Sequence, residues 1–280
     1  MIKSYSRWWR TTDRSPATLK NYVYSLERLA ERLGGERQLV HATIDDLRDY
    51  LGDRLEATSP GTASVDFRAM RSYFSWLVAE GELDVNPAAR LRSPEVDQTP
   101  VKVATEVDYR RLLAACPKTT IAGRRDAAIF AVLWATGMRR GEVAALDLEH
   151  LDMDAGTLSI RKTKNGTPRS VPLDVDALGL LDRWLRRRGY EPGPLFVGER
   201  GGRLSSNGIG QMFDRRRDEA GVDVSAHTFR RALARRWLLA EGGETALRSI
   251  AGWKSPAMVG RYTRMAAEEL AHAEYRRLFG

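Results

Sequence analysis

The residues best suited to chemistry lie in one stretch, positions 226–265. His227 and Arg230 are three residues apart, so in a helix their side chains lie on the same face. Tyr262 follows Trp253 by nine positions, in a segment rich in helix-forming residues. An arginine and a histidine can hold a phosphodiester while a phenol attacks its phosphorus. The pattern therefore favours nucleophilic chemistry on a phosphate.

Two upstream segments carry further basic residues at short spacing. The first, ATGMRRGEVAAL at positions 135–146, contains Arg139 and, three residues later, Glu142. The second, KTKNGTPRSVPL at positions 162–173, has two lysines before an Asn-Gly turn and ends in Val-Pro-Leu. Both segments offer cations that can bind a phosphate group.

Together, the arginine box, the lysine-bearing segment, His-x-x-Arg and the Trp-to-Tyr spacing resemble the signature of the tyrosine recombinases (phage integrases and Xer-type recombinases). The resemblance implies a site-specific DNA recombinase that cuts and rejoins strands through a 3′-phosphotyrosine intermediate and a free 5′-hydroxyl, without ATP, metal or cofactor. It also implies a fold that is mainly α with a small antiparallel β-sheet. An N-terminal, SAM-like helical core-binding bundle would precede an α+β catalytic domain.

The resemblance assigns the phosphate-binding role to Arg139 and Arg230. Arginine suits this role because its planar guanidinium stays charged and bonds two oxygens at once. Tyr262 would be the nucleophile, and its phenol, with a pKa of about 10, needs surrounding cations to stabilise the ionised form. His227 would donate to a phosphate oxygen or assist the proton transfer of the tyrosine.

Lys164 is the expected general acid for the leaving 5′-oxygen, carried on a β-hairpin. Lys162 lies two residues away on the same strand face and is the alternative, but the spacing back from Arg169 and Pro172 favours Lys164. Trp253 stands where many family members have histidine. Because an indole N–H can donate to phosphate but cannot shuttle a proton, we expect Trp253 to act in positioning only.

Glu142 is expected to orient an arginine rather than touch DNA. Arg140 and Arg231 each lie one step beyond a motif arginine, and we interpret both as neighbours; Arg231 takes a position where the family often has a second histidine. Contacts to DNA are predicted for Arg231, Lys162 and five basic residues near the N-terminus, which alternatively form a solvated charged face: Lys3, Arg7, Arg10, Arg14 and Lys20. Trp8 and Trp9, among the first of these, either stack on DNA or pack on the protein.

The charge of the chain favours a polyanionic partner. The formal net charge is +8, and the isoelectric point is about 9.8. Residues 1–100 carry 14 Lys and Arg against 15 Asp and Glu, whereas residues 101–280 carry 31 against 22. The basic excess therefore lies in the part of the chain that holds the candidate chemistry.

Other classes of protein are disfavoured. The sequence has no apolar run near the ~18 residues of a membrane span, and its N-terminus lacks the apolar core of a signal peptide. The single cysteine, Cys116, excludes an internal disulfide framework, fits a reducing cytoplasm and is expected to be a buried helix residue. With four histidines and no carboxylate–histidine metal spacing, we expect no zinc site.

Helical periodicity between short polar turns predicts an α-helical bundle over residues 1–92. Its helices are expected over 15–33, 43–55 and 59–77, with a short last turn from Asn86 to about Arg92. Because the first bundle helix would begin near Ser15, we expect no additional arm-binding domain. This favours a compact integrase or Xer-like enzyme that uses short core sites. Residues 93–103 contain two prolines and several charges and are predicted to be the interdomain linker.

The catalytic domain is predicted over residues 104–280. An apolar helix over 125–136 leads into the arginine box, and alternating residues at 158–161 and 169–173 predict paired strands. Further helices are expected over 105–116, 175–188, 206–220 and, at the C-terminus, 266–279, and residues 194–197 are expected to form a short strand or extended loop.

The partner implied by the resemblance is double-stranded DNA carrying recombination sites. We expect a monomer in solution and a homotetramer on two paired duplexes. An accessory DNA-bending or directionality factor is a further possible partner. The C-terminal helix would dock either on a neighbouring protomer or in cis. Two other functions stay open: a type IB topoisomerase-like relaxing enzyme, which needs no second site, and a non-catalytic DNA-binding relative.

Overall fold

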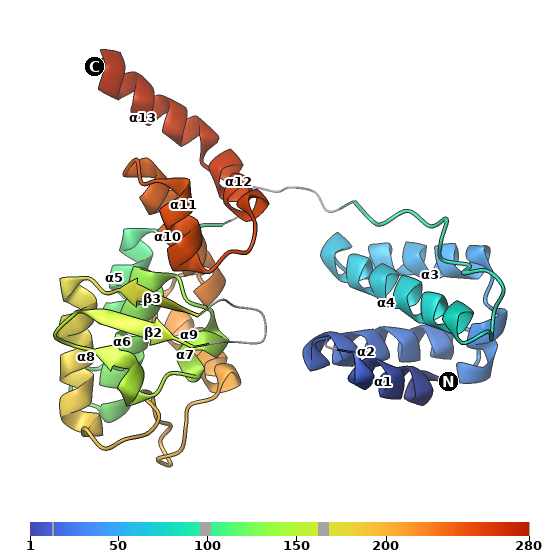
Figure 1. The fold of residues 1–280 in the computed structure, drawn as a ribbon, viewed down its shortest axis with the longest axis horizontal. Helices are drawn as coiled ribbons and strands as arrows, with labels where there is room; N and C mark the ends of the chain where they lie inside the picture. Colours follow the sequence, from blue (N-terminus) through green and yellow to red (C-terminus); the bar gives the residue numbers. More distant parts are fainter. Residues whose placement is uncertain (13, 96–101, 162–167, 280) are drawn as a thin grey trace. The chain divides into compact units, whose positions relative to one another are not determined.

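The computed structural model describes residues 1–12, 14–95, 102–161 and 168–279. It divides into two compact units, Met1–Thr99 and Pro100–Gly280 (Figure 1). Each unit has its own hydrophobic core. The predicted fold class, mainly α with a small antiparallel sheet, is confirmed.

The first unit is a helical bundle. Its elements are α1 (Ile2–Thr11), α2 (Pro16–Arg32), the 3₁₀ helix η1 (Glu36–His41), α3 (Ile44–Ala57) and α4 (Pro60–Ala79). Proline at the first position starts α2 and α4, and a capping box between Thr43 and Asp46 starts α3. A buried ion pair between Arg54 and Asp66 (2.6 Å) ties α3 to α4.

The prediction that the first helix begins near Ser15 is wrong, because α1 precedes it. Ile2, Tyr5 and Trp9 recur at helical spacing and are buried. Tyr5 packs edge-on against Tyr73 of α4 with ring centroids 5.4 Å apart. The N-cap position of α1 is Met1, which offers no side-chain cap, so the sequence lacked the usual start signal for this helix.

The two tryptophans of α1 contact other aromatic side chains of the bundle. Trp9 is 4% exposed, and Trp8 is half-buried and stacks on Tyr5 with ring centroids 5.7 Å apart. The Arg14 guanidinium lies over both indoles, 5.4 Å from the Trp8 centroid and 4.9 Å from that of Trp9. Of the two alternatives for these tryptophans, the packing interpretation therefore holds for Trp9.

The second unit is built around α6. Its helices are α5 (Glu106–Ala114), α6 (Ile121–Thr136), α7 (Arg140–Ala144), η2 (Leu148–His150), α8 (Val175–Arg188), α9 (Ser206–Ala220), α10 (Ala226–Leu239), α11 (Glu244–Ala251), α12 (Pro256–Met265) and α13 (Ala267–Phe279). Nearly every side chain of α6 is buried because α5, α8 and α10 pack around it. Gly137 ends α6 in the left-handed region (φ 60°), where a Cβ would lie 2.8 Å from Leu233 Cδ2.

The sheet of the second unit has the strand order β1-β2-β3 and is antiparallel throughout. Its strands are β1 (Leu151–Asp152), β2 (Thr157–Ile160) and β3 (Arg169–Pro172). The predicted β2–β3 pairing is confirmed, with Leu158 opposite Val171 and Ile160 opposite Arg169. The two-residue β1 was not predicted, since it is too short to show alternation. The Asn-Gly turn of this hairpin lies outside the described residues.

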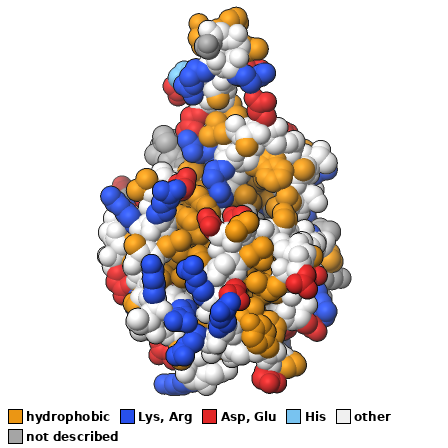
Figure 2. Space-filling view, turned by 90° about the vertical axis from the view of Figure 1, so that its left-hand side faces the viewer, with side chains coloured by type: hydrophobic (Ala, Val, Ile, Leu, Met, Phe, Trp, Pro, Cys, Tyr) orange, Lys and Arg blue, Asp and Glu red, His pale blue; other side chains and the backbone are white. Residues whose placement is uncertain are grey.

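The C-terminal helix α13 projects from the body of the second unit (Figure 1). It has no buried residue, and its large exposed apolar side chains are Tyr275, Leu278 and Phe279. They lie toward the end of the helix, where hydrophobic side chains gather at the top of Figure 2. Across the ranges that the structure covers, no helix has the length and apolar character needed to cross a membrane.

Candidate active site

Arg139 is held by Glu142 at the start of α7. The Arg139 backbone N–H donates to Glu142 Oε2 (2.9 Å), and Arg139 Nη1 donates to Glu142 Oε1 (3.1 Å). The Glu142 side chain is only 2% exposed, whereas that of Arg139 is 41% exposed. Glu142 therefore orients the guanidinium of Arg139, while the rest of that group stays accessible to a ligand.

Arg169, at the start of β3, is a component of the site that the sequence interpretation used only as a spacing marker. Its Nη1 and Nη2 donate to Oε1 (3.2 Å) and Oε2 (3.0 Å) of Glu142, and its Nε donates to the carbonyl of Ile250 (2.8 Å). Its side chain is 5% exposed. The sequence did hold one signal for this role. Arg169 is two residues before the apolar Val171, so both side chains lie on the inner face of the strand, and an arginine on an inner face needs a partner.

Glu142 stays ionised despite its burial. Burial alone would raise the pKa of Glu142, but the hydrogen bonds from Arg169 and from the Arg139 backbone, with the charges of both guanidinium groups, lower it below the ordinary value. One buried carboxylate thus serves two arginines that lie in different elements.

Arg230 lies on the inner face of α10 and is 4% exposed. Its Nη1 donates to the carbonyl of Gly137 (2.8 Å) and its Nη2 to that of Ala251 (2.5 Å). Burial and the nearby charge of Arg139 lower the pKa of Arg230 to about 10. Both of these carbonyls are neutral, so the guanidinium keeps a positive charge that an incoming anion can neutralise.

Trp253 contacts both Arg230 and Tyr262. The Arg230 guanidinium carbon lies 5.1 Å from the Trp253 ring centroid, and the Tyr262 ring stacks on Trp253 with centroids 4.7 Å apart and planes 10° apart. Tyr262 is 8% exposed. The Trp253 Nε1 is buried and, within the part of the chain that the structure covers, has no hydrogen-bond partner. The indole thus links the phenol of α12 to the cation of α10.

The structure therefore brings five of the predicted site residues together: Arg139, Glu142, Arg230, Trp253 and Tyr262. His227 is exposed in the first turn of α10, one turn before Arg230. Lys162 and Lys164 lie outside the described residues.

The predicted DNA-contact residues are spread over both units. Arg231 points elsewhere on α10, and its Nη1 donates to the carbonyl of Lys102 (3.2 Å). In the first unit, the following side chains are exposed: Lys3, Arg7, Arg10, Arg14 and Lys20. Of these, Arg14 is engaged with the two indoles of α1.

The Cys116 thiol and a cluster of two carboxylates with a histidine are other reactive groups of the second unit, and both are accounted for by their local contacts. Cys116 is buried, its S–H donates to the carbonyl of Leu112 (3.2 Å), and burial raises the pKa of its thiol to about 12, so it is a packing residue. The ligand atoms of Asp147, Glu149 and His150 lie within 4.8 Å of one another, a grouping that the sequence interpretation did not foresee. Both carboxylates there are paired with arginines, Asp147 with Arg203 (2.5 Å) and Glu149 with Arg161 (3.2 Å).

Comparison with known proteins identifies the chain. The family described as "Phage integrase family" matches residues 102–269, and "Phage integrase, N-terminal SAM-like domain" matches residues 2–81. The chain belongs to the phage integrase family and is a site-specific DNA recombinase of the tyrosine type.

Its relatives include the tyrosine recombinases XerC of two bacteria. The chain is 30% identical to that of Shewanella amazonensis over 278 residues, which cover 96% of this chain and 93% of the relative. It is 30% identical to that of Myxococcus xanthus over 275 residues, 91% of this chain and 89% of the relative.

Solved structures share the fold at lower identity. A lambda integrase dimer bound to a COC′ core site matches with a TM-score of 0.78 at 20% identity, over 93% of each chain. The Tn1549 transposon integrase in complex with transposon right end DNA matches with a TM-score of 0.77 at 19% identity, over 100% of this chain and 99% of that one.

Proposed function

We propose that Tyr262 is the nucleophile of this recombinase and that Arg139 and Arg230 hold the scissile phosphate. The observation that carries the proposal is the shared environment of these groups. Arg139 and Tyr262 both lie near enough to the buried Arg230 to influence its pKa, and Tyr262 and Arg230 contact the same indole. Two guanidinium groups can neutralise the charge that builds on the non-bridging oxygens as the phosphorus is attacked.

The cleavage step exchanges one phosphorus–oxygen bond for another. The Tyr262 oxygen forms a bond to phosphorus, and the bond from phosphorus to the 5′-oxygen breaks. Lys164 gives a proton to that leaving oxygen, and His227 assists the loss of the phenol proton. Attack by the 5′-hydroxyl of another strand reverses the step and conserves the bond energy, so we propose chemistry without ATP, metal or another cofactor.

The stacking of Tyr262 on Trp253 sets a requirement for this step. A phenol that is 8% exposed and lies flat on an indole is shielded from a bulky phosphodiester. We propose that DNA binding shifts α12 and releases the tyrosine toward the phosphate. Trp253, freed of the ring, can then offer its unpartnered Nε1 to a phosphate oxygen.

We also propose that the chain acts as a homotetramer on paired duplexes and is a monomer in solution in the cytoplasm. Among the structures that share the fold is a lambda integrase tetramer bound to a Holliday junction. An accessory DNA-bending or directionality factor stays a prediction from the sequence.

The exchange of strands between two sites is the direct test. Plasmids that carry two copies of a cleaved site should be converted into recombinant products, because each phosphotyrosine is resolved by a strand from the partner site. A plasmid without such a site should keep its supercoils. Relaxation of the site-free plasmid, with no recombinants from the two-site plasmid, would instead indicate a topoisomerase.

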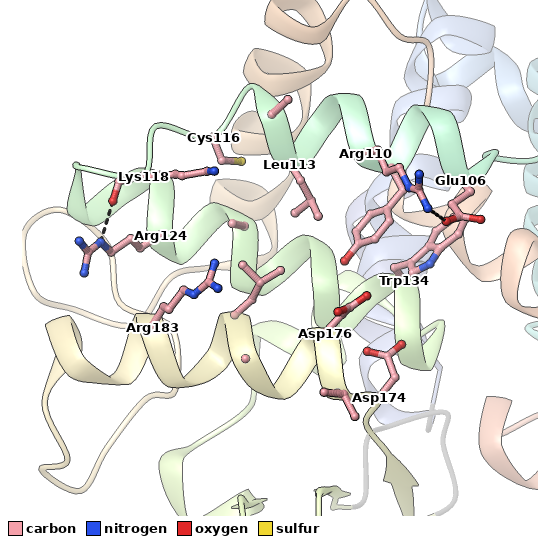
Figure 3. A pocket seen from close by; sticks show the side chains of 17 residues that line it. Glu106, Arg110, Leu113, Cys116, Lys118, Arg124, Trp134, Asp174, Asp176 and Arg183 are labelled. Atoms are coloured by element: carbon pink, nitrogen blue, oxygen red, sulfur yellow. Dashed lines mark hydrogen bonds and ion pairs between the residues drawn. The ribbon is translucent and has the colours of Figure 1, made fainter.

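A hollow of about 810 Å³ between α5, α6 and α8 is the surface that we propose receives α13 of a neighbouring protomer. Figure 3 shows acidic side chains at one end, Asp174, Asp176 and Glu106, the last of them paired with Arg110, and basic ones at the other, Lys118, Arg124 and Arg183. The charges of α13 are complementary to this hollow when Glu268, in the first turn of the helix, faces the basic end and Arg276, in the last turn, faces the acidic end. Apolar walls at Leu113 and Leu180 suit the exposed apolar side chains of the helix.

A charge swap tests this docking. Arg276→Glu should lower the rate of two-site recombination by about 2- to 5-fold per interface, the size expected of an exposed ion pair. Adding Asp176→Arg in the same chain should restore the rate, because the reversed pair attracts again. Covalent cleavage of a single site by either variant serves as the control for folding. A second substitution that lowers the rate further, rather than restoring it, would rule out this groove as the receiver.

A further inference from the structure

Arg169 joins three elements that carry separate parts of the active site. From β3, its guanidinium bonds both oxygens of Glu142 on α7 and the carbonyl of Ile250 on α11. We propose that Arg169 is a positioning residue that fixes the two phosphate-binding arginines relative to each other. The inference rests on the proposed roles of Arg139 and Arg230.

The first half of this link runs through Glu142 to Arg139. Four N–H donors converge on the carboxylate: two from the Arg169 guanidinium, one from the Arg139 guanidinium and one from the Arg139 backbone. A carboxylate has about four acceptor positions, so its orientation is fully determined. Since both Glu142 and Arg169 are almost completely buried, water cannot replace a lost bond.

The second half runs through the end of α11 to Arg230. The carbonyl of Ile250 accepts from Arg169, and the next carbonyl along the chain, that of Ala251, accepts from Arg230. Consecutive peptide groups thus hold the two arginines. Gly252 follows with φ 64°, and a Cβ there would lie 2.7 Å from Arg169 Nη1, so the backbone can approach this closely only at glycine.

A phosphate gripped from two sides requires a fixed spacing between the two guanidinium groups. Arg169 sets that spacing, because it touches the partner of Arg139 on one side and the segment that holds Arg230 on the other. Lysine cannot replace it, since a single ammonium cannot span both oxygens of Glu142 and the Ile250 carbonyl in one plane. Arg169→Lys should therefore impair the positioning of the phosphate, and leave DNA binding and protonation of the leaving group intact.

The experiment uses the full chain and a nicked duplex selected from random DNA by covalent capture with the wild-type protein. The nick releases the short 5′-hydroxyl strand and traps the adduct, so the single-turnover rate at saturating protein reports the chemical step. Arg169→Lys should lower this rate by about 100-fold, as expected for a small misplacement of binding groups. Its affinity for the same duplex should stay within about threefold of wild type.

Arg216→Lys is the matched control. Arg216 is also buried, with 7% of its side chain exposed, and it also bonds a buried carboxylate, Asp126, and a backbone carbonyl, that of Ala115. It should lose as much thermal stability as Arg169→Lys but cleave within about threefold of the wild-type rate. Equal rate losses in the two variants, or none in Arg169→Lys, would overturn the inference.

A sulfur leaving group separates positioning from proton donation. In this substrate sulfur replaces the bridging 5′-oxygen. The leaving thiolate needs no general acid, because the pKa of a free thiol is only about 8.5. Lys164→Ala should recover on this substrate, whereas Arg169→Lys should stay slow. Recovery of Arg169→Lys would show that it acts on the leaving group and refute the link through Glu142. Failure of the wild-type protein to form any adduct would instead overturn the proposed function itself.

Discussion

Tyr262→Phe should abolish the covalent protein–DNA adduct on denaturing gels. Phenylalanine lacks the oxygen that bonds to phosphorus, and no other residue in the proposed site supplies a nucleophile of the same reach. The ring should keep its stacking on Trp253, where the centroids are 4.7 Å apart in the wild-type protein. DNA affinity in a gel-shift assay should therefore change by less than about twofold.

Tyr275→Phe provides the matched control for this prediction. Tyr275 is 65% exposed on α13, and its hydroxyl has no part in the proposed chemistry. The control variant should form the adduct at the wild-type rate. An undiminished adduct in Tyr262→Phe would assign the nucleophile to a different residue.

Arg230→Lys should reduce the cleavage rate by about 100-fold or more, the usual effect of removing one donor from a transition-state oxygen. The wild-type guanidinium bonds the carbonyls of Gly137 and Ala251 and still carries a charge toward the site. Lysine keeps a charge but has a single nitrogen, so it cannot make both bonds and hold phosphate as well.

The pH dependence of the same variant gives a second measurement. Burial and Arg139 already lower the pKa of Arg230 to about 10, and a lysine starts from about 10.4, lower than arginine. Burial lowers a lysine pKa further, so the residual cleavage should fall as the pH rises through the alkaline range. The wild-type site should keep its charge up to about pH 10.

Arg235→Lys on the same helix is the control for Arg230→Lys. Arg235 pairs with Glu269 at the surface, with 38% of its side chain exposed, so its replacement should leave cleavage near the wild-type rate at every pH. A near-normal rate for Arg230→Lys would place Arg230 outside the active site.

Most helices could be predicted because their ends carry local signals. Side-chain caps at Thr105, Asp174 and Ser205 start α5, α8 and α9 at the expected places. The start of α1 was missed because Met1 offers no cap. Ile2, Tyr5 and Trp9 do recur at helical spacing, but the aromatic partners of Tyr5 lie on the distant α4.

The residue types of the site could be predicted, but the hydrogen bonds that join them could not. Motif spacing singled out Arg139, Arg230 and Tyr262, yet the bond from Arg230 to Gly137 joins residues 93 positions apart. The bond from Arg169 to Ile250 spans 81 positions. Such contacts depend on the packing of α10 on α6 and of α11 on β3, which no local pattern encodes. The stacking of Tyr262 on Trp253 is a matter of side-chain rotamers and was likewise not foreseen.

The burial of Arg230 ties the folding of the second unit to its substrate. A cation that is removed from water and hydrogen-bonded to the neutral carbonyls of Gly137 and Ala251 weakens the native state relative to an apolar residue of the same shape. Any anion that binds there recovers part of that free energy, and it does so only in the folded protein. The protein without DNA should therefore unfold at a lower temperature than its complex with DNA. Part of the affinity for phosphate comes from relief of the unfavourable burial of Arg230.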